Sequence, residues 1–364
     1  MVVDFMKVAI VMGTRPEIIK LSPIIKNLNK NNSTIIFTGQ HYDYDMSTSF
    51  IEELDLRKPD YYMKLTKLEN TTTDRATQIG EIVLKLAKII SPINPDTVMV
   101  QGDTNTVLAA AITGIKCNIP VSHVEAGLRS YDWRMPEEHN RIAVDHISEF
   151  LFAPTSHNKK TLEEEKVHGE IYVTGNTSID AIEQNIKRLE KKRTIDIKSD
   201  DFVLVTLHRG ENVDDPSALS PIITALLKSR INMIFPAHPR TVRRLKQFGL
   251  YNKIENSNIL LLPTVGYFDM LFLMKKCRFI ISDSGGIQEE ATSPKIRKKV
   301  LVIRKTTDRI EAVKYGFSEL VGTDINSIIH AIKKNMNAKI LSHENPYGKG
   351  NAGKKIISIL RKKF

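Results

Sequence analysis

The sequence has almost no cysteine: Cys117 and Cys277 are the only two in 364 residues. Both lie among apolar residues, which argues against a disulfide framework or a cysteine-ligated metal site. No apolar run approaches the roughly 18 residues that a membrane-spanning helix needs. Met1–Lys7 leads directly into the strand-like VAIVM, so we expect no secretory leader. These absences predict a cytosolic protein that does not enter a membrane.

Acidic residues are outnumbered, with 42 Asp and Glu against 53 Lys and Arg, which gives a formal charge of +11. The basic residues are spread along the chain, however, and no nucleic-acid motif with interleaved aromatic residues is present. An anionic small substrate and a lysine-rich surface explain the charge better than nucleic acid does. The hydrophobic content of 41% and charged content of 26% are typical of globular proteins, and the length suffices for two domains.

Short apolar runs alternate with helical patterns along the whole chain. They predict strands at 7–12, 34–38, 97–100, 120–124, 150–153, 171–174, 202–207, 233–237, 259–263, 279–282 and 300–303. Strands that alternate with helices in this way form parallel sheets with crossover helices. The lysine-rich segment 186–201 divides the series in half. We therefore predict doubly wound α/β domains at 1–185 and 186–344, with a helix in 345–364 that crosses back to the first domain.

The segment 278–291, RFIISDSGGIQEEA, predicts a buried strand, a small polar turn and a helix start. Unpaired N–H groups and the positive end of the helix dipole make such a start an anion site. Of the two glutamates that follow, one is placed to accept hydrogen bonds from ribose hydroxyls. The alternative is a capped helix with a charged face. A nucleotide with a phosphate tail is the better interpretation.

The first strand ends in Gly13-Thr14-Arg15, where a dinucleotide-binding enzyme carries G-x-G-x-x-G. Only one glycine is present, and no acidic residue follows the second strand, so an NAD site is not expected. Arg15 is either a phosphate clamp or a surface arginine before a helix-starting proline.

Carboxylates and histidines follow other strands. Asp103 is either an acid/base group or the cap of the next helix. His123 and Glu125 lie in or after a buried strand, where an unpaired charge is costly, so an ion pair with Arg129 or Arg141 is the structural alternative. Zinc-type spacing, a nucleophile elbow and an obvious Schiff-base lysine are all missing. Because strand ends gather ligands, we expect one site that contains Arg15, Asp103, Glu125, His208, His238 and Ser284.

The motifs resemble, in order, those of the non-hydrolysing UDP-N-acetylglucosamine 2-epimerases. The matching segments are GTRPEIIK, TGQH, QGDT, HVEAGLRS, PEEHNR, FAPT, TGN, HRGEN, SDSGGIQEEA, RKTTDRIEAV, LVGTD and NPYG. The resemblance implies two Rossmann-like domains that face each other across a cleft, as in GT-B glycosyltransferases, and a homodimer. It also implies catalysis without a cofactor or a metal.

The implied reaction removes the proton from C2 of the sugar while UDP leaves C1, and UDP then adds back after protonation of the opposite face. The family's catalytic positions fall on Asp103, Glu125, Glu137 and His208. Its UDP-sugar contacts fall on Arg15, Lys20, Ser284, Gly285, Gly286, Glu290 and Arg309. Further candidates for substrate or regulatory contacts are Gln40, His41, Arg209 and His238.

The chain also departs from the family pattern. Bacterial members often carry a Gln-x-x-Gln pair that is linked to activation by a second substrate molecule, whereas here Gln40 is followed at that spacing by Asp43. A GT-B glycosyltransferase and a hydrolysing epimerase that use the same UDP-sugar remain alternative functions, and a non-enzymatic nucleotide-binding module is a third.

Overall fold

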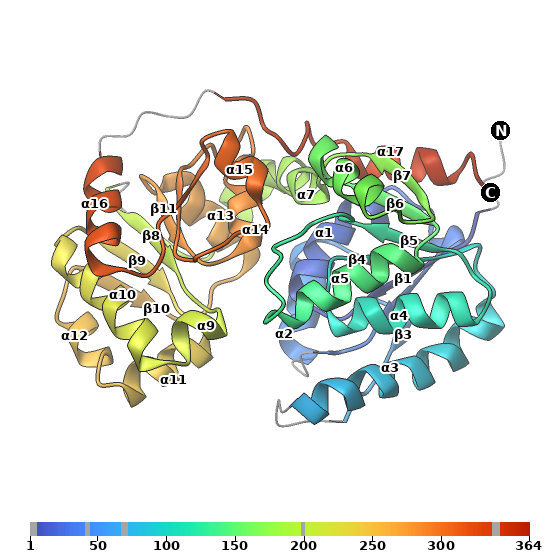
Figure 1. The fold of residues 1–364 in the computed structure, drawn as a ribbon, viewed down its shortest axis with the longest axis horizontal. Helices are drawn as coiled ribbons and strands as arrows, with labels where there is room; N and C mark the ends of the chain where they lie inside the picture. The colour runs from blue at the N-terminus through green and yellow to red at the C-terminus, as the bar shows by residue number, and fades with distance from the viewer. Residues whose placement is uncertain (1–5, 41–43, 67–71, 198–200, 337–342) are drawn as a thin grey trace. The chain divides into compact units, whose positions relative to one another are not determined.

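The computed structural model describes residues 6–40, 44–66, 72–197, 201–336 and 343–364 (Figure 1). The chain divides into two compact units, one formed by residues 1–184 and 347–364 and the other by residues 185–346. These limits lie within two residues of the division predicted from the lysine-rich segment.

The first unit is built on a seven-stranded sheet in the order β3-β2-β1-β4-β5-β6-β7, and all of its pairings are parallel. Its strands are β1 (Val8–Met12), β2 (Ser33–Phe37), β3 (Tyr61–Tyr62), β4 (Thr97–Gln101), β5 (Val121–Val124), β6 (Phe150–Ala153) and β7 (Glu170–Val173). Its helices are α1 (Arg15–Ile25), α2 (Tyr44–Glu53), α3 (Thr72–Ile93), α4 (Asn105–Lys116), α5 (Pro136–Ile147), α6 (Ser156–Glu164), α7 (Thr177–Asn185) and α17 (Ala352–Leu360). A short 3₁₀ turn covers Lys30–Asn32.

The second unit has a six-stranded sheet in the order β10-β9-β8-β11-β12-β13, again parallel throughout. Its strands are β8 (Val203–Thr206), β9 (Met233–Pro236), β10 (Ile259–Leu262), β11 (Ile280–Ser282), β12 (Val300–Val302) and β13 (Ser318–Leu320). A 3₁₀ turn at Ile186–Arg188 precedes its helices, which are α8 (Leu189–Lys192), α9 (Gly210–Val213), α10 (Pro216–Ser229), α11 (Pro239–Gln247), α12 (Tyr251–Glu255), α13 (Tyr267–Lys276), α14 (Gly285–Glu290), α15 (Ile310–Lys314) and α16 (Ile325–Asn335).

The central strands form because they are apolar on both faces, as a parallel sheet covered by helices requires. Every residue of β1, β4, β5, β8 and β11 is buried. In the first unit, Val11 and Val100 pack with Leu86 of α3 and with the small side chain of Ala110 of α4. The predicted fold class, α/β with two Rossmann-like doubly wound units, is confirmed.

Strand order reverses between β1 and β4 in the first unit and between β8 and β11 in the second. Ligands of open α/β sheets bind beyond the carboxyl ends of the strands at such a reversal. The turns that leave these four strands carry Arg15, Asp103, His208 and Ser284. The fold therefore places four of the predicted site residues where each sheet is open to a ligand.

The C-terminal helix α17 belongs to the first unit. Asp180 of α7 accepts hydrogen bonds from the backbone N–H groups of Ala352 (3.1 Å) and Gly353 (2.9 Å), which begin α17. A Cβ atom on Gly353 would lie 3.3 Å from Pro23, so α17 packs closely on α1. Its apolar face, with Ile356, Ile357 and Leu360, is buried in this contact. In the part of the chain that the structure describes, no helix is both long and apolar enough to cross a membrane.

Candidate active site

Glu125 follows β5 and occupies a left-handed backbone conformation, with φ of +74°. Such a conformation costs a non-glycine residue about 1–3 kcal/mol and persists only where the surroundings enforce it. Here the backbone N–H groups of Glu125 and Ala126 both donate to the carbonyl oxygen of Phe152. The strained backbone turns the Glu125 side chain toward α1 and α7 instead of into the sheet.

The Glu125 carboxylate is buried and surrounded by donors. Its Oε2 atom pairs with the ammonium group of Lys20 on α1. Gln101 at the end of β4 donates to the same oxygen at 3.1 Å, and Asn176 before α7 donates at 3.4 Å. The predicted catalytic Glu125 and the predicted substrate contact Lys20 are thus brought together. Arg129 was one of the two arginines expected to form an ion pair with His123 or Glu125. It pairs with Asp145 and Glu165 instead.

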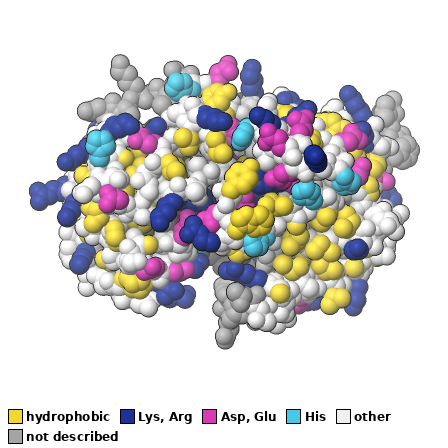
Figure 2. Space-filling view, in the orientation of Figure 1, with side chains coloured by type: hydrophobic (Ala, Val, Ile, Leu, Met, Phe, Trp, Pro, Cys, Tyr) yellow, Lys and Arg dark blue, Asp and Glu magenta, His cyan; other side chains and the backbone are white. Residues whose placement is uncertain are grey.

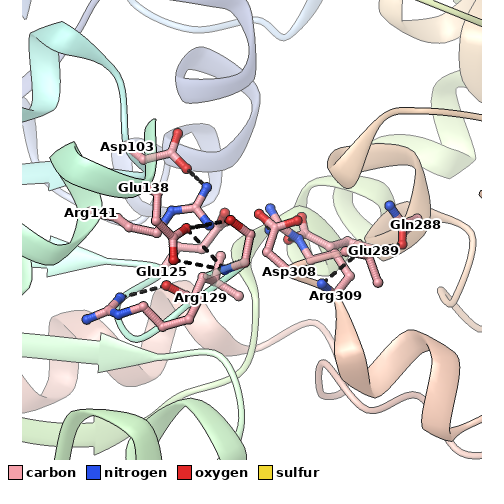
Figure 3. A network of polar contacts seen from close by, with 12 residues as sticks. Asp103, Glu125, Arg129, Glu138, Arg141, Gln288, Glu289, Asp308 and Arg309 are labelled. Atoms are coloured by element: carbon pink, nitrogen blue, oxygen red, sulfur yellow. Dashed lines mark hydrogen bonds and ion pairs between the residues drawn. The ribbon is translucent and has the colours of Figure 1, made fainter. Parts of the chain in front are cut away.

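Asp103 leaves β4 after Gly102, whose φ of +85° suits glycine. Its carboxylate pairs with the buried guanidinium of Arg141 and remains about a quarter exposed (Figure 3). Asn140 donates to the Asp103 carbonyl oxygen at 2.9 Å. Asp103 is therefore not the cap of α4, because Thr104 fills that position and accepts from Val107. A partly exposed carboxylate beside a fixed cation remains available to a ligand.

Two adjacent glutamates on α5 have different roles. Glu138 is fully buried and accepts hydrogen bonds from the N–H groups of Ser130 and Tyr131, and it also pairs with Arg141. It holds the loop before α5. Glu137, the predicted catalytic residue, is half-buried in the first helical turn and makes no hydrogen bond or ion pair among the described residues. Its carboxylate is thus the less constrained of the two.

Other predicted residues of the first unit have mostly structural contacts. The guanidinium of Arg15 stacks on the Phe50 ring at 4.0 Å from the ring centre. The side-chain oxygen of Gln40 accepts from both the N–H and the hydroxyl of Thr106, each at 2.8 Å, so Gln40 stabilises the start of α4. His41 lies outside the described residues.

Glu17 of α1 links the turns that follow β1 and β4. One carboxylate oxygen accepts from the N–H groups of Gly13 and Thr14, and the other accepts from the Thr104 hydroxyl at 2.6 Å. Complete burial raises the pKa of Glu17 from 4.5 to about 7, although these hydrogen bonds oppose the shift. The two turns that carry Arg15 and Asp103 thus share a carboxyl group that is partly protonated near neutral pH.

We expect Glu17→Gln to flatten the pH dependence of thermal stability. The folded protein keeps a proton on Glu17 that the unfolded chain releases above its pKa of 4.5. Stability from this group is therefore complete below that pKa and is lost as the pH rises through about 7, by about 3 kcal/mol in all. A glutamine amide keeps the contacts with Gly13, Thr14 and Thr104 but does not titrate.

Calorimetric Tm values of both proteins between about pH 5 and pH 8 test this prediction. The wild-type Tm should fall more steeply than that of the variant. Glu52→Gln, a change at an exposed glutamate of α2, is the control and should follow the wild type. Parallel curves for wild type and Glu17→Gln would mean that Glu17 ionises as an ordinary glutamate.

In the second unit, His208 and the turn after β11 are joined by Asp283. Thr206 of β8 pairs with Ser282 of β11, so the residues that follow these strands lie side by side. Asp283 is fully buried and accepts from the N–H groups of His208 (3.2 Å) and Arg209 (3.0 Å). Its Oδ1 atom also lies 3.3 Å from Nδ1 of His208. Because Nδ1 faces this carboxylate, Nε2 is the nitrogen left for acid/base work, and the ring is about half exposed.

Ser284 caps α14 as predicted from its sequence, with its hydroxyl accepting from Ile287 at 3.5 Å. The next residues, Gly285 and Gly286, supply N–H groups that have no partner within the helix. A Cβ atom on Gly285 would lie 3.3 Å from the guanidinium carbon of Arg309. A side chain at this position would crowd the arginine, which lies directly over the start of the helix.

Arg309 is almost completely buried and pairs with Glu289 and Asp308 (Figure 3). Glu289 is therefore the structural glutamate of the pair on α14. Glu290 is half-buried. The pKa of Tyr267 is raised mainly by the burial of Tyr267 itself and, as the second cause, by the charge of Glu290. Of the two glutamates, Glu290 is the less buried.

Two further arginines lie at the same edge of the second sheet. Arg209 donates to the Asp283 carbonyl oxygen at 3.1 Å. Arg304 is buried and donates to Glu211 at 3.1 Å. Burial is the main cause that lowers the pKa of Arg304. The positive charge of Arg209 is the second cause, so the two cations are close. His238 caps α11 by accepting from the N–H of Arg240 at 3.2 Å and is exposed. This edge is strongly positive and suits an anion.

Four polar residues that hold the candidate side chains in place were not predicted as site residues: Glu138 and Arg141 in the first unit, and Asp283 and Arg304 in the second. Asp283 could have been predicted from the sequence, because it directly follows a buried strand. Asp103 and His208 each lie two residues after the end of their strands. No signal in the sequence separated Glu138 from Glu137. Among the described residues, no group of three or more His, Cys, Asp or Glu side chains is arranged to hold a metal ion.

Two Rossmann-like units, each with polar side chains at the carboxyl edge of a parallel sheet, define an α/β protein of the GT-B-like class. The chain belongs to the UDP-N-acetylglucosamine 2-epimerase family, whose sequence profile matches residues 25–361. It is 42% identical to the UDP-N-acetylglucosamine 2-epimerase of Methanocaldococcus jannaschii over 369 residues, which cover 98% of this chain and 99% of that protein.

Solved structures give the same result. The crystal structure of the Methanocaldococcus jannaschii UDP-GlcNAc 2-epimerase in complex with UDP-GlcNAc and UDP is similar, with a TM-score of 0.89 and 41% identity over 98% of this chain and 100% of that one. The Neisseria meningitidis UDP-GlcNAc 2-epimerase bound to UDP-GlcNAc has a TM-score of 0.88 and 34% identity, with coverage of 98% and 100%. The predicted family is confirmed.

Proposed function

We propose that this chain is a non-hydrolysing epimerase that interconverts UDP-GlcNAc and UDP-ManNAc without a cofactor. The observation that carries the proposal is the position of Glu125 in the HVEAGLRS motif: a buried carboxylate, on a strained strand end, paired with Lys20. Asp103 reaches the same edge of the sheet, because Gln101 of β4 pairs with Val124 of β5. The strain is supported by the fold and serves to aim one acidic group at the ligand edge.

The reaction needs groups that remove and return a proton at C2. A base takes the C2 proton while the bond between C1 and the UDP oxygen breaks, which gives 2-acetamidoglucal and UDP. The proton then returns to the opposite face of C2, and UDP adds back to C1. Because two faces must be served, we assign this work to Asp103, Glu125, Glu137 and His208. Of the four, Glu137 has the fewest contacts in the described part of the chain.

The second unit supplies the site for UDP. The start of α14 at Ser284, Gly285 and Gly286 presents N–H groups to the diphosphate, and Arg309 lies over the same turn. Glu290 accepts from the ribose. Between the two chemical steps UDP is detached from the sugar, so the same positive groups must stabilise it as a leaving group and keep it bound. In the first unit, Arg15 and Lys20 are assigned to the substrate.

Proton NMR of UDP-GlcNAc with the protein in D₂O tests the function. We expect signals of UDP-ManNAc to appear, C2 to gain deuterium in both sugars, and UDP to remain attached. The variant His168→Asn, which changes an exposed histidine outside the matching segments, should behave in the same way. An unchanged C2 would refute the proposal. Release of free sugar would favour a hydrolysing epimerase, and transfer to an acceptor a glycosyltransferase.

We also propose that the protein is a homodimer that associates through α3, α4 and α5. Figure 2 shows hydrophobic side chains gathered over these helices. Leu84 on α3 is 70% exposed, and Ile112 and Ile142 on α4 and α5 are only half-buried. A continuous apolar face of this kind is unusual for a monomer. Sedimentation equilibrium should give twice the chain mass of 41.2 kDa, and the monomer mass would exclude the dimer.

The proposed compartment is the cytosol. Cys117 and Cys277 are both unpaired, and burial raises the pKa of Cys277 to about 12, so this thiol is unreactive. Unpaired cysteines fit a reducing compartment. Detection of the protein in the soluble fraction of lysed cells, and not in the exported fraction, is the measurement that checks this assignment.

A further inference from the structure

His123 lies within β5 and is 1% exposed, yet both of its ring nitrogens have close polar neighbours. Nδ1 is 2.7 Å from Oδ1 of Asp145, and Nε2 is 2.8 Å from the carbonyl oxygen of Gly102. Gly102 directly precedes Asp103, one of the four residues assigned to the chemistry. His123 therefore touches the backbone that carries a catalytic carboxylate, although its side chain does not reach the ligand edge itself.

Both neighbours of the ring accept hydrogen bonds and neither has a proton to give. A carbonyl oxygen is only an acceptor. Asp145 accepts from the guanidinium of Arg129 at 2.7 Å and from the N–H of Gly127 at 3.1 Å, and both groups only donate, so they favour its ionised form. Asp145 is thus a carboxylate and also only an acceptor. A neutral imidazole has one N–H group and cannot satisfy both neighbours.

The charges around the ring also favour a second ring proton. Nη1 of Arg129 donates to Asp145, and the same guanidinium pairs with Glu165 at the end of α6. Glu165 is about a quarter exposed and also lies 3.7 Å from Nε2 of His146, so its charge is shared with solvent and with that ring. The fully buried Asp145 lies between Arg129 and His123, and its negative charge stabilises the imidazolium form of the His123 ring.

We propose that His123 is a buried imidazolium that acts as a positioning residue for Asp103, an inference that rests on the proposed epimerase function. Three side chains hold this turn: His123 donates to the Gly102 carbonyl, Asn140 donates to the Asp103 carbonyl, and Arg141 pairs with the carboxylate. Arg141 and Asn140 lie on α5, as Asp145 does, whereas His123 lies in the sheet. The turn is therefore fixed to both the helix and the strand.

Nitrogen-15 NMR of the histidine rings in the wild-type protein tests the protonation state directly. At about pH 8, an ordinary neutral imidazole shows one protonated and one unprotonated ring nitrogen. His123, assigned through its ring contacts with Gly102, should show two protonated nitrogens. An unprotonated ring nitrogen on His123 at this pH would overturn the proposal. This measurement does not depend on catalysis or on the folding of a variant.

The variant His123→Gln tests the positioning role. We expect kcat for epimerisation to fall about 10- to 100-fold because the Asp103 turn is displaced, while KM stays within about threefold. His168→Asn is the matched control and should leave both constants unchanged. A folded His123→Gln protein with wild-type kcat would overturn the role. If the wild type itself does not epimerise UDP-GlcNAc, the function fails, and the ring spectrum still decides whether the imidazolium exists.

Discussion

Glu125→Gln is expected to lower kcat for UDP-GlcNAc epimerisation by about 10²- to 10⁴-fold, the range that a lost acid/base group gives. The amide has nearly the same shape, so the substrate should still bind. It cannot accept the C2 proton, however, and it changes the contact with Lys20, whose ammonium pairs with the carboxylate. Incorporation of deuterium at C2 should fall by the same factor as epimerisation, because both need proton removal.

The same variant also disturbs a buried ion pair, and this must be separated from the chemistry. Removing one partner of such a pair destabilises a protein by about 3 kcal/mol, since the other charge stays in the interior. The double variant Glu125→Gln/Lys20→Met replaces both charges and should recover most of the lost Tm. If kcat at saturating substrate stays low in the double variant but not in Lys20→Met alone, Glu125 acts in catalysis. If activity returns with the Tm, Glu125 only balances the charge of Lys20.

The central strands were predictable because a strand buried on both faces needs an apolar run, and such runs are visible in the sequence. Two strands were missed, β3 (Tyr61–Tyr62) and β13 (Ser318–Leu320). Both lie at an edge of their sheet and are only two or three residues long. Tyr61 and Leu320 are each about 40% exposed, so no apolar run marks these strands. These two strands are defined by backbone hydrogen bonds with one neighbouring strand, and no pattern of side chains marks them.

The candidate site was predictable as far as local turns determine it. Asp103, Glu125, His208 and Ser284 each lie within two residues of the end of a strand, and the fold places all four at the carboxyl edge of a sheet. Contacts between distant segments were not predictable. Whether Glu137 or Glu138 is buried depends on the direction in which α5 packs. That Asp283 lies beside His208, 75 residues away, depends on the pairing of β8 with β11, and strand order cannot be read from either segment alone.

Asp283→Asn should therefore have an effect as large as a change in His208 itself. Asp283 faces Nδ1 of His208 at 3.3 Å and has no exposed surface. A carboxylate in this position selects the ring form in which Nδ1 carries the proton and Nε2 can exchange one with the substrate. An amide nitrogen there would donate to Nδ1 and reverse the two roles. We expect kcat to fall about 10²- to 10⁴-fold, as in other cases where a histidine loses its orienting carboxylate.

A double-mutant cycle decides whether Asp283 acts through the ring. If it does, Asp283→Asn/His208→Asn should be no slower than His208→Asn alone, because the second change removes a partner that is already lost. The inhibition constant of UDP should stay within about threefold in all three variants, since Ser284 and Arg309 are unchanged. Asp283 also accepts from the N–H of Arg209 and from Asn212, however. If instead UDP binding falls sharply and the two substitutions lower kcat by the product of their separate effects, Asp283 acts by holding the turn that binds the phosphates.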